Sequence, residues 1–260
     1  MRIYNPEIIK LEANEIHLWF AFIDEIHNTE ILAAYEKLLT KEEKARQGRF
    51  HFERHRRQYL VTRALVRTTL SRYTGVEPRD WRFSTNEYGR PEISAPGGLP
   101  LLRFNLSHTD GLIACAVVLK WDIGVDVEDM KRKGQTVEIA ERFFSPMEVK
   151  DLRMLESGKR GRFFDYWTLK ESYIKARGKG LSIPLEQFSF HISDKRPLRI
   201  FFGPRIKDDP SQWQFWLLRP TIRHKAALSL RRKKEKDCIL SIKRVIPLVE
   251  EKSFSCIYDK

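Results

Sequence analysis

The chain has 260 residues, of which 42% are hydrophobic and 12% aromatic, so it is no disordered chain and allows one large domain or two of ordinary size. Its net charge of +13 indicates anionic partners, such as nucleic acid, an acidic protein, a polyphosphate ligand or a membrane surface. Three cysteines are too few for a disulfide framework or a zinc site, and without a signal peptide or a long apolar run we expect a soluble cytoplasmic protein.

The first part of the chain predicts a strand followed by helices. The predicted elements are a strand over 15–23 and helices over 30–39, from residue 40, and over 52–74. Thr40 and Glu43 form the capping box that opens a helix. Gly75 is placed to end the helix over 52–74.

Strands are predicted over the next fifty residues. A turn at 88–91 separates two extended segments, and the segment 101–128 reads as three strands. The turns between these three strands are predicted at 107–111, where Asp110-Gly111 is the strongest signal, and at 120–122.

Helices return after residue 130. A helix is predicted to start at Ser145, which would be its N-cap, because Pro146 and Glu148 follow at the positions typical of a helix start. The next helix contains Tyr166 and ends at Gly178. Strands are then predicted over 188–192, 197–203, 213–218, 225–230 and 238–246. The order of strand, helices and strands occurs twice, which predicts an α+β fold from a duplicated unit with a boundary near residue 120.

An acid and a base lie one turn apart in the second of these helices. At 100° per residue, Phe164, Glu171 and Lys175 fall on one narrow stripe, with Trp167 close beside it. A surface ion pair between Glu171 and Lys175 explains this spacing as well as a functional role does. The helix alone leaves both interpretations open.

Two further carboxylates lie in the segment "DIGVDVE". On a strand, Gly124, Asp126 and Glu128 share one face, and the two carboxylates repel each other unless a cation or basic group lies between them. Gly124 leaves room for that group. An exposed polar face is the alternative, although the neighbouring strands are strongly apolar. With Glu171, these carboxylates would form an oxygen ligand set suited to Mg²⁺.

The turn "NLSHTDG" is a third candidate. His108 is predicted to follow a strand end, between Ser107 and Thr109, where a phosphate could be hydrogen-bonded. A lone histidine in a turn is more often structural or merely exposed.

The segments "FSTNEYGRPEI", "FNLSHT", "IGVDVE", "ERFFSPMEV" and "WTLKESYIKARGKGLSIPL", in this order, resemble the Sfp-type 4′-phosphopantetheinyl transferases. The resemblance covers residues 40–192 well and the termini loosely. It implies two similar ferredoxin-like α/β halves related by a pseudo-two-fold axis. Residues 1–120 would form the N-terminal half, with the contacts to the CoA 3′-phosphate and nucleotide. Residues 121–260 would form the C-terminal half, with the Mg²⁺-binding carboxylates and the catalytic helix.

The resemblance also implies a reaction. The 4′-phosphopantetheine arm of coenzyme A moves to a serine of an apo acyl or peptidyl carrier protein, and adenosine 3′,5′-bisphosphate is released. Such a holo-[acyl-carrier-protein] synthase requires Mg²⁺, with Mn²⁺ as a substitute. The expected partner is an acidic carrier protein, attracted by the basic charge and contacting Phe143, Phe144 and Met147, which could equally be core. Because one chain holds both halves, we expect a monomer, with neither nucleic acid nor membrane as partner.

The resemblance assigns the catalytic roles to four residues. Asp126, Glu128 and Glu171 would hold Mg²⁺, and Lys175 would contact a pyrophosphate oxygen and stabilise the leaving phosphate. Either Glu171 or a metal-bound water held by Glu128 would be the general base, and the sequence does not separate the two. The residue between the strand carboxylates is Val127, where some subgroups of the family carry a further metal ligand.

The remaining site residues would bind coenzyme A. Lys170 and His108 would bind its phosphates, and Ser107 and Arg90 would position the nucleotide. Arg90 stands where the family often has lysine, so the charge is kept but the geometry differs. The 3′-phosphate would be bound by a basic cluster before the long helix, in which Arg46 and Arg49 are the best matches.

Three other functions compete with the transferase. A nucleic-acid-binding protein suits the charge, but no recognised binding signature is found and the basic residues form no single stripe. A different Mg²⁺-dependent phosphotransferase or nuclease could use the same carboxylates. A catalytically inactive interaction module is less favoured, because the acidic and lysine positions are intact.

Overall fold

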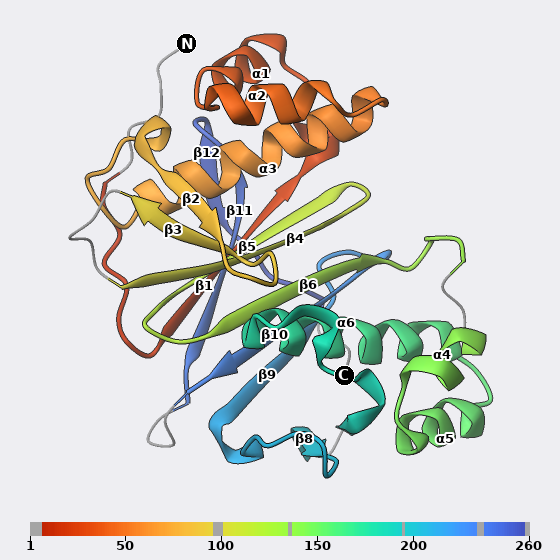
Figure 1. Ribbon diagram of the computed structural model, residues 1–260. Coiled ribbons are helices and arrows are strands. Elements are labelled where there is room, and N and C mark those ends of the chain that lie inside the picture. The colour runs from red at the N-terminus through yellow and green to blue at the C-terminus, as the bar shows by residue number, and fades with distance from the viewer. Residues whose placement is uncertain (1–6, 96–100, 135–136, 194–195, 233–236, 258–260) are drawn as a thin grey trace. The chain divides into compact units, whose positions relative to one another are not determined.

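The computed structural model describes residues 7–95, 101–134, 137–193, 196–232 and 237–257 (Figure 1). The described residues form two compact units, which are treated separately here. Unit 1 is made of the described parts of Met1–Ser84, Pro91–Lys120 and Ile239–Ser255. Unit 2 is made of the described parts of Thr85–Arg90, Trp121–Cys238 and Cys256–Lys260.

Unit 1 is a five-stranded sheet with helices. Its helices are α1 (Thr29–Glu36), α2 (Lys41–Gly48) and α3 (Glu53–Ser71), and its sheet strands are β1 (Glu15–Phe22), β4 (Leu102–Thr109), β5 (Leu112–Leu119), β11 (Ile239–Ile246) and β12 (Glu250–Ser253). The strand order is β12-β11-β1-β5-β4, with β1 antiparallel to β5 and parallel to β11. β2 (Arg82–Thr85) and β3 (Pro91–Ala95) form a separate ribbon.

The core of unit 1 lies between α3 and the sheet. Leu65 and Val61 of α3 are buried in one apolar cluster with Trp19 of β1. α3 ends at Ser71, so the prediction that it runs to 74 with Gly75 as its C-cap is wrong. Beyond the helix, the hydroxyl of Tyr73 accepts a hydrogen bond from Trp19 Nε1 at 2.8 Å, which directs the chain back into the core.

Unit 2 has a three-stranded antiparallel sheet. Its strands are β6 (Ile123–Asp129), β9 (Trp213–Leu218) and β10 (His224–Arg231), in the order β6-β10-β9, and a ribbon is formed by β7 (Phe188–Ser193) and β8 (Arg196–Phe202). Its helices are α4 (Val137–Phe143), α5 (Pro146–Met154) and α6 (Lys159–Arg177). The long helix α6 packs along β6 and β10 (Figure 1).

The predicted helix ends are confirmed where local chemistry sets them. Ser145 and Glu148 make a complete capping box at the start of α5, as Thr40 and Glu43 do for α2. Gly178 ends α6 in the left-handed conformation, φ +62°, that glycine adopts most readily.

The two units repeat one connectivity, which confirms the α+β class. Each unit begins with one strand, β1 or β6, followed by helices of which the last, α3 or α6, is 19 residues long. An antiparallel pair of strands comes later, β4 and β5 or β9 and β10, and its second strand lies beside the first strand of the unit. The orders β1-β5-β4 and β6-β10-β9 therefore correspond. The pseudo-two-fold axis concerns the placement of the units relative to each other and stays a prediction.

Cutting the chain at residue 120 does not yield these units. β11 pairs with the edge of β1, whose N–H and C=O groups would otherwise lack sheet partners, so residues 239–255 belong to unit 1. Residues 85–90 belong to unit 2. Among the helices that the structure describes, none is both long and apolar enough to cross a membrane.

Candidate active site

Strand β6 and helix α6 touch backbone to backbone at Gly124. A Cβ added to Gly124 would lie 2.0 Å from the carbonyl oxygen of Ser172 and 2.4 Å from the backbone nitrogen of Ala176. The Ser172 hydroxyl is also 2.7 Å from the hydroxyl of Ser229, which pairs with Gly124 across the sheet. The space at Gly124 is therefore filled by the backbone of α6, and not by the cation or basic group that the sequence led us to expect there.

The two strand carboxylates share the face of β6 that α6 covers. Side chains alternate along a strand, so Asp126 and Glu128 lie on the same side as Gly124. Every residue of β6 is buried, and Asp126 and Glu128 are only 5% and 7% exposed. The alternative of a solvated polar face is therefore wrong.

Three residues of α6, spaced four apart, meet these carboxylates. Lys175 Nζ donates to Asp126 Oδ1 at 2.7 Å. Trp167 Nε1 donates to Glu128 Oε1 at 3.2 Å. Glu171 lies between Trp167 and Lys175 on the same helical stripe, because residues four apart are neighbours on a helix surface. The stripe predicted from the sequence thus runs along the carboxylate face of β6.

Two carboxyl groups of the site, those of Glu128 and Glu171, have raised pKa values. Burial and, to a smaller extent, the charge of Asp126 raise the pKa of Glu171 to about 7, although Lys175 opposes the shift. Burial and Asp126 likewise raise the pKa of Glu128 to about 7, against the nearby Arg132 guanidinium. Burial of both carboxyl groups is thus the main reason for their raised pKa values, and the charge of Asp126 adds to it.

This donor set fits a hard divalent cation by its chemistry. Three carboxylates on facing elements offer the oxygen ligands that Mg²⁺ prefers. Within the described residues, however, no three His, Cys, Asp or Glu side chains already stand together as a metal cluster. Two of the carboxylates are instead engaged by cationic side chains, Asp126 by Lys175 and Glu128 by Arg132, whose Nη1 is 3.3 Å from both carboxylate oxygens.

Lys170 lies away from this set, in the core. Its side chain is 1% exposed, and its Nζ donates to the carbonyl oxygens of Leu185 at 2.9 Å and Phe188 at 2.6 Å. The third partner is Glu148 at 2.8 Å, which is itself completely buried. With three oxygen partners Lys170 has no N–H left for a phosphate, so the structure contradicts its expected role in binding coenzyme A.

Arg90 lies at the C-terminal end of α6. Its guanidinium donates to the carbonyl oxygen of Ala176 at 3.0 Å and approaches Asp122 at 3.7 Å. The side chain is 18% exposed, so part of it remains accessible. These contacts join Arg90 to the element that carries Lys175.

The other expected ligands of coenzyme A belong to unit 1. His108 is exposed within β4, paired with Ile113, and does not follow the strand end as the sequence suggested. Ser107 is 7% exposed. Because neighbouring side chains on a strand point to opposite faces, Ser107 and His108 do not present their side chains on one surface.

The basic cluster of unit 1 is open to solvent. Arg46, in α2, and Arg49, its C-cap residue, are exposed and line an open depression of about 690 Å³ together with Glu42, Ala45 and Phe50. Arg46 also lies 5.9 Å above the Tyr59 ring. The depression is compatible with a phosphate ligand.

The structure thus brings together Asp126, Glu128, Glu171 and Lys175 in unit 2. Sequence reasoning missed the hydrogen bond of Trp167 to Glu128, although the i,i+4 spacing from Glu171 could have indicated it. It also missed Arg132, which follows Glu128 by four residues across a turn.

Comparison with known proteins agrees with this geometry. A sequence profile of the 4′-phosphopantetheinyl transferase superfamily matches residues 122–230, and one of the N-terminal region of 4′-phosphopantetheinyl transferases matches residues 27–119. The 4′-phosphopantetheinyl transferase HetI of Nostoc sp. is 35% identical over 200 residues, which are 76% of this chain and 83% of that relative. The chain therefore belongs to the 4′-phosphopantetheinyl transferase superfamily.

Two further comparisons cover less. The 4′-phosphopantetheinyl transferase Sfp of Bacillus subtilis is 40% identical over 153 residues, 58% of this chain and 65% of the relative. A crystal structure of the holo-[acyl-carrier-protein] synthase of Thermotoga maritima aligns with 45% of this chain and 66% of its own, at 22% identity and a TM-score of 0.37.

Proposed function

We propose that this protein transfers the 4′-phosphopantetheine arm of coenzyme A to a serine hydroxyl of an apo carrier protein. A bond forms between the serine oxygen and the phosphorus next to the pantetheine, and the bond from that phosphorus to the pyrophosphate bridge oxygen breaks. Adenosine 3′,5′-bisphosphate leaves with that oxygen. The observation that carries the proposal is the facing of Glu171 and Lys175 with Asp126, in a member of this superfamily.

Glu171 is the proposed general base. A serine hydroxyl is a weak nucleophile and must lose its proton during the attack. Glu171 lies between Trp167 and Lys175 on the stripe of α6 that meets the carboxylates of β6, which places its carboxylate where the reacting groups would be held. Glu171 would accept the serine proton as the oxygen–phosphorus bond forms.

Lys175 is the proposed stabiliser of the leaving group. Phosphoryl transfer depends mainly on positioning and on neutralising the charge of the phosphate oxygens. Lys175 is half-buried with its ammonium group at Asp126, so it offers a fixed positive charge beside the carboxylates. It would neutralise the departing phosphate oxygen.

Asp126, Glu128 and Glu171 are the proposed ligands of Mg²⁺, with Mn²⁺ as a substitute. When bound, such a cation would neutralise the pyrophosphate charge of coenzyme A. Burial and the charge of Asp126 raise the pKa values of Glu128 and Glu171, and a bound cation would offset both effects.

Coenzyme A would use further residues. We propose that Arg46 and Arg49 bind the 3′-phosphate, because both are exposed cations beside one depression. Ser107, His108 and Arg90 remain proposed nucleotide contacts.

We also propose the cytoplasm as the place of action. The three cysteines are free thiols, which is consistent with a reducing compartment.

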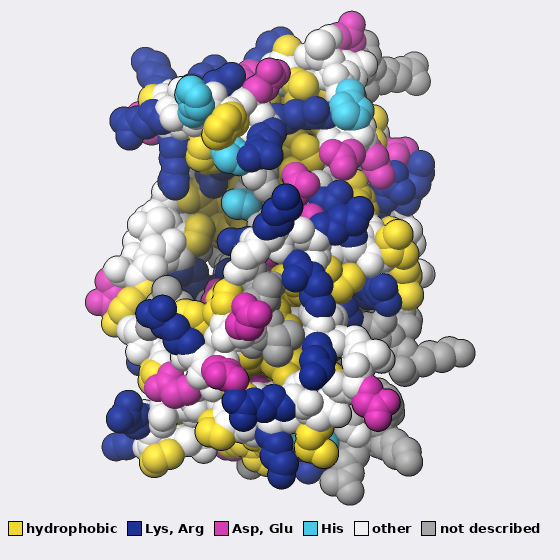
Figure 2. Space-filling model, turned by 90° about the vertical axis from the view of Figure 1, so that its right-hand side faces the viewer, with side chains coloured by type: hydrophobic (Ala, Val, Ile, Leu, Met, Phe, Trp, Pro, Cys, Tyr) yellow, Lys and Arg dark blue, Asp and Glu magenta, His cyan; other side chains and the backbone are white. Residues whose placement is uncertain are grey.

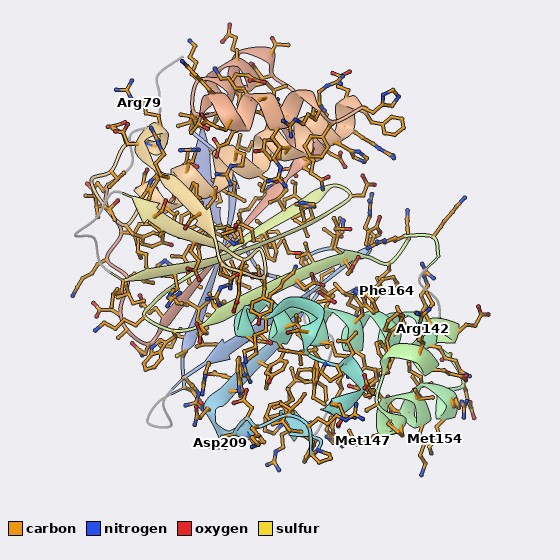
Figure 3. All side chains as sticks on the ribbon, in the orientation of Figure 1. Arg79, Arg142, Met147, Met154, Phe164 and Asp209 are labelled. Carbon is orange, nitrogen blue, oxygen red and sulfur yellow. The ribbon has the colours of Figure 1, made fainter. Side chains whose placement is uncertain are left out.

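An acidic carrier protein is the proposed partner of a monomeric enzyme. Of the apolar residues expected at the contact, Phe144 is core at 3% exposure, whereas Met147 is 42% exposed. Met147 belongs to α5 and is labelled in Figure 3. Figure 2 shows Lys and Arg side chains interspersed with Asp and Glu on the visible face.

Release of adenosine 3′,5′-bisphosphate tests the proposal. The protein, coenzyme A and Mg²⁺ are incubated with an apo carrier, and with the same carrier whose acceptor serine is replaced by alanine. Release with the first carrier alone, abolished by EDTA and restored by Mg²⁺ or Mn²⁺, is the expected result. Release without any carrier would point instead to a nucleotide hydrolase.

A further inference from the structure

A turn after strand β2 belongs to unit 2, whereas the chain on both sides of it belongs to unit 1. This turn is Thr85–Arg90. Asn86 organises it, since its Oδ1 accepts hydrogen bonds from the backbone N–H groups of Tyr88 at 3.0 Å and Arg90 at 2.9 Å. Side-chain acceptance of this kind is how asparagine stabilises a tight turn.

The same turn satisfies carbonyl groups at the C-terminal end of α6. The last four carbonyls of a helix have no partner inside it and carry partial negative charge. Asn86 Nδ2 donates to the carbonyl oxygen of Gly178 at 2.8 Å, and Arg90 Nη1 donates to that of Ala176 at 3.0 Å. Two side chains of one turn therefore bind the C-terminal end of α6, Arg90 at a carbonyl of the last helical turn and Asn86 at the carbonyl of the C-cap residue Gly178.

Gly178 allows this close approach. Its φ of +62° favours glycine, and a Cβ there would lie 2.6 Å from Cζ of Arg90. The guanidinium thus packs directly on the glycine, so the turn and the helix end form one tightly packed contact.

The capped turn of the helix is the one that presents Lys175. The two capped carbonyls belong to Ala176 and Gly178, one and three residues beyond it. Lys175 Nζ lies 2.7 Å from Asp126 Oδ1, so small shifts of the last helical turn would move the ammonium group away from the carboxylates.

We propose that Asn86 is a positioning residue for the transfer reaction, acting through its hydrogen bond to the carbonyl of Gly178. This inference rests on the proposed function. Asn86 holds the last turn of α6 so that Lys175 meets the leaving phosphate, and it touches no substrate itself. Its loss should lower kcat and leave the binding of coenzyme A almost unchanged.

Asn86→Asp separates the two tasks of this side chain. The carboxylate keeps an acceptor for the N–H groups of Tyr88 and Arg90, but it sets an oxygen against the carbonyl of Gly178 instead of a donor. We expect kcat to fall about tenfold, the effect of roughly one lost hydrogen bond made repulsive, with KM for coenzyme A within about twofold of wild type.

Two glycine variants of the same helix provide a matched pair. Gly178 and Gly158 both adopt a positive φ at opposite ends of α6, but a Cβ at Gly158 meets no atom within 4 Å. Gly178→Ala displaces Arg90 and should lower kcat like Asn86→Asp. Gly158→Ala introduces similar backbone strain, so Tm should fall comparably while kcat is kept.

The test measures kcat, KM for coenzyme A and Tm of the wild-type protein and of the three variants. A kcat loss in Asn86→Asp and Gly178→Ala alone is the predicted outcome. An unchanged kcat with a raised KM for coenzyme A in Asn86→Asp would make Asn86 a ligand contact and overturn the inference. An equal kcat loss in Gly158→Ala would overturn it too, as an effect of stability. An inactive wild-type protein would instead refute the proposed function.

Discussion

At the scale of single residues, two lysines of one helix have opposite roles. Lys170 and Lys175 look alike in sequence, and the family resemblance implied that both contact phosphate groups of coenzyme A. The partner that separates them is Glu148, which lies 22 positions before Lys170, so helix periodicity cannot reveal it. Burial of a charge depends on such distant partners, which explains why this assignment failed while the stripe of Glu171 and Lys175 was predicted correctly.

Replacing Lys170 should therefore affect stability. Lys170→Met leaves the Glu148 carboxylate buried without its ion-pair partner, which should lower the free energy of unfolding by about 3–5 kcal/mol. Adding Glu148→Gln should restore part of that loss. Urea denaturation measures both. A Lys170→Met protein that is as stable as wild type but binds coenzyme A more weakly would contradict this account and show that Lys170 binds a phosphate of coenzyme A.

Glu43 gives a pH-dependent prediction. Burial would raise its pKa, but Arg63, the Thr40 N–H and Arg67 outweigh burial, so the pKa lies below its usual range. A carboxylate with a lower pKa in the folded state stabilises the fold above its unfolded pKa of about 4.3, and this contribution is lost as pH falls through the folded value.

Glu43→Gln should thus cost about 2 kcal/mol of unfolding free energy at neutral pH, and the difference from wild type should shrink in acid. Urea denaturation across pH measures this. Glu42→Gln, in the same helical turn but exposed, is the control and should show a much smaller difference. A Glu43→Gln difference that stays constant down to acid pH would contradict the assignment.

At the scale of elements, local chemistry was predictable and long-range pairing was not. Capping needs only neighbouring residues, so the helix starts at Thr40 and Ser145 and the end at Gly178 were found from sequence. The parallel pairing of β11 with β1 joins segments more than 200 residues apart, and the period-two pattern of a strand does not name its partner. His108 was misplaced because Asp110-Gly111 by itself completes the turn and β4 runs on to Thr109.

The contact between β6 and α6 yields the sharpest prediction at this scale. Gly124→Ala would place a methyl group 2.0 Å from the Ser172 carbonyl, and neither backbone can move away cheaply. We expect a loss of about 3 kcal/mol or more in unfolding free energy and loss of transfer.

Gly161→Ala is the matched control. Gly161 lies inside α6 with no atom within 4 Å of its added Cβ, so alanine should stabilise the helix by about 0.5–1 kcal/mol. Thermal and urea unfolding of both variants gives the answer. If Gly124→Ala were tolerated, β6 and α6 could not lie as close as described.

At the scale of the whole molecule, the chain returns to its first unit after residue 238, through residues 239–255. Residues 1–120 on their own lack β11, and β1 would then expose a bare sheet edge beside the core. We predict that this fragment shows no cooperative urea transition by circular dichroism. The same fragment joined through a flexible linker to residues 239–255 should show one. Cooperative unfolding of residues 1–120 alone would contradict the division into units.

The duplication in this chain concentrates the proposed chemistry in unit 2. Asp126, Glu128, Glu171 and Lys175 come from one strand and one helix, held at the contact of Gly124 with α6. The central claim is that this set catalyses the transfer of phosphopantetheine.

Intact mass spectrometry of an apo acyl carrier protein, incubated with coenzyme A, Mg²⁺ and either wild-type protein or Glu171→Gln, tests that claim most directly. A carrier mass increased by one phosphopantetheine group with wild type, and unchanged with a Glu171→Gln protein of normal Tm, is the predicted result. No increase on several different carriers, from a folded wild-type protein that binds coenzyme A, would contradict it.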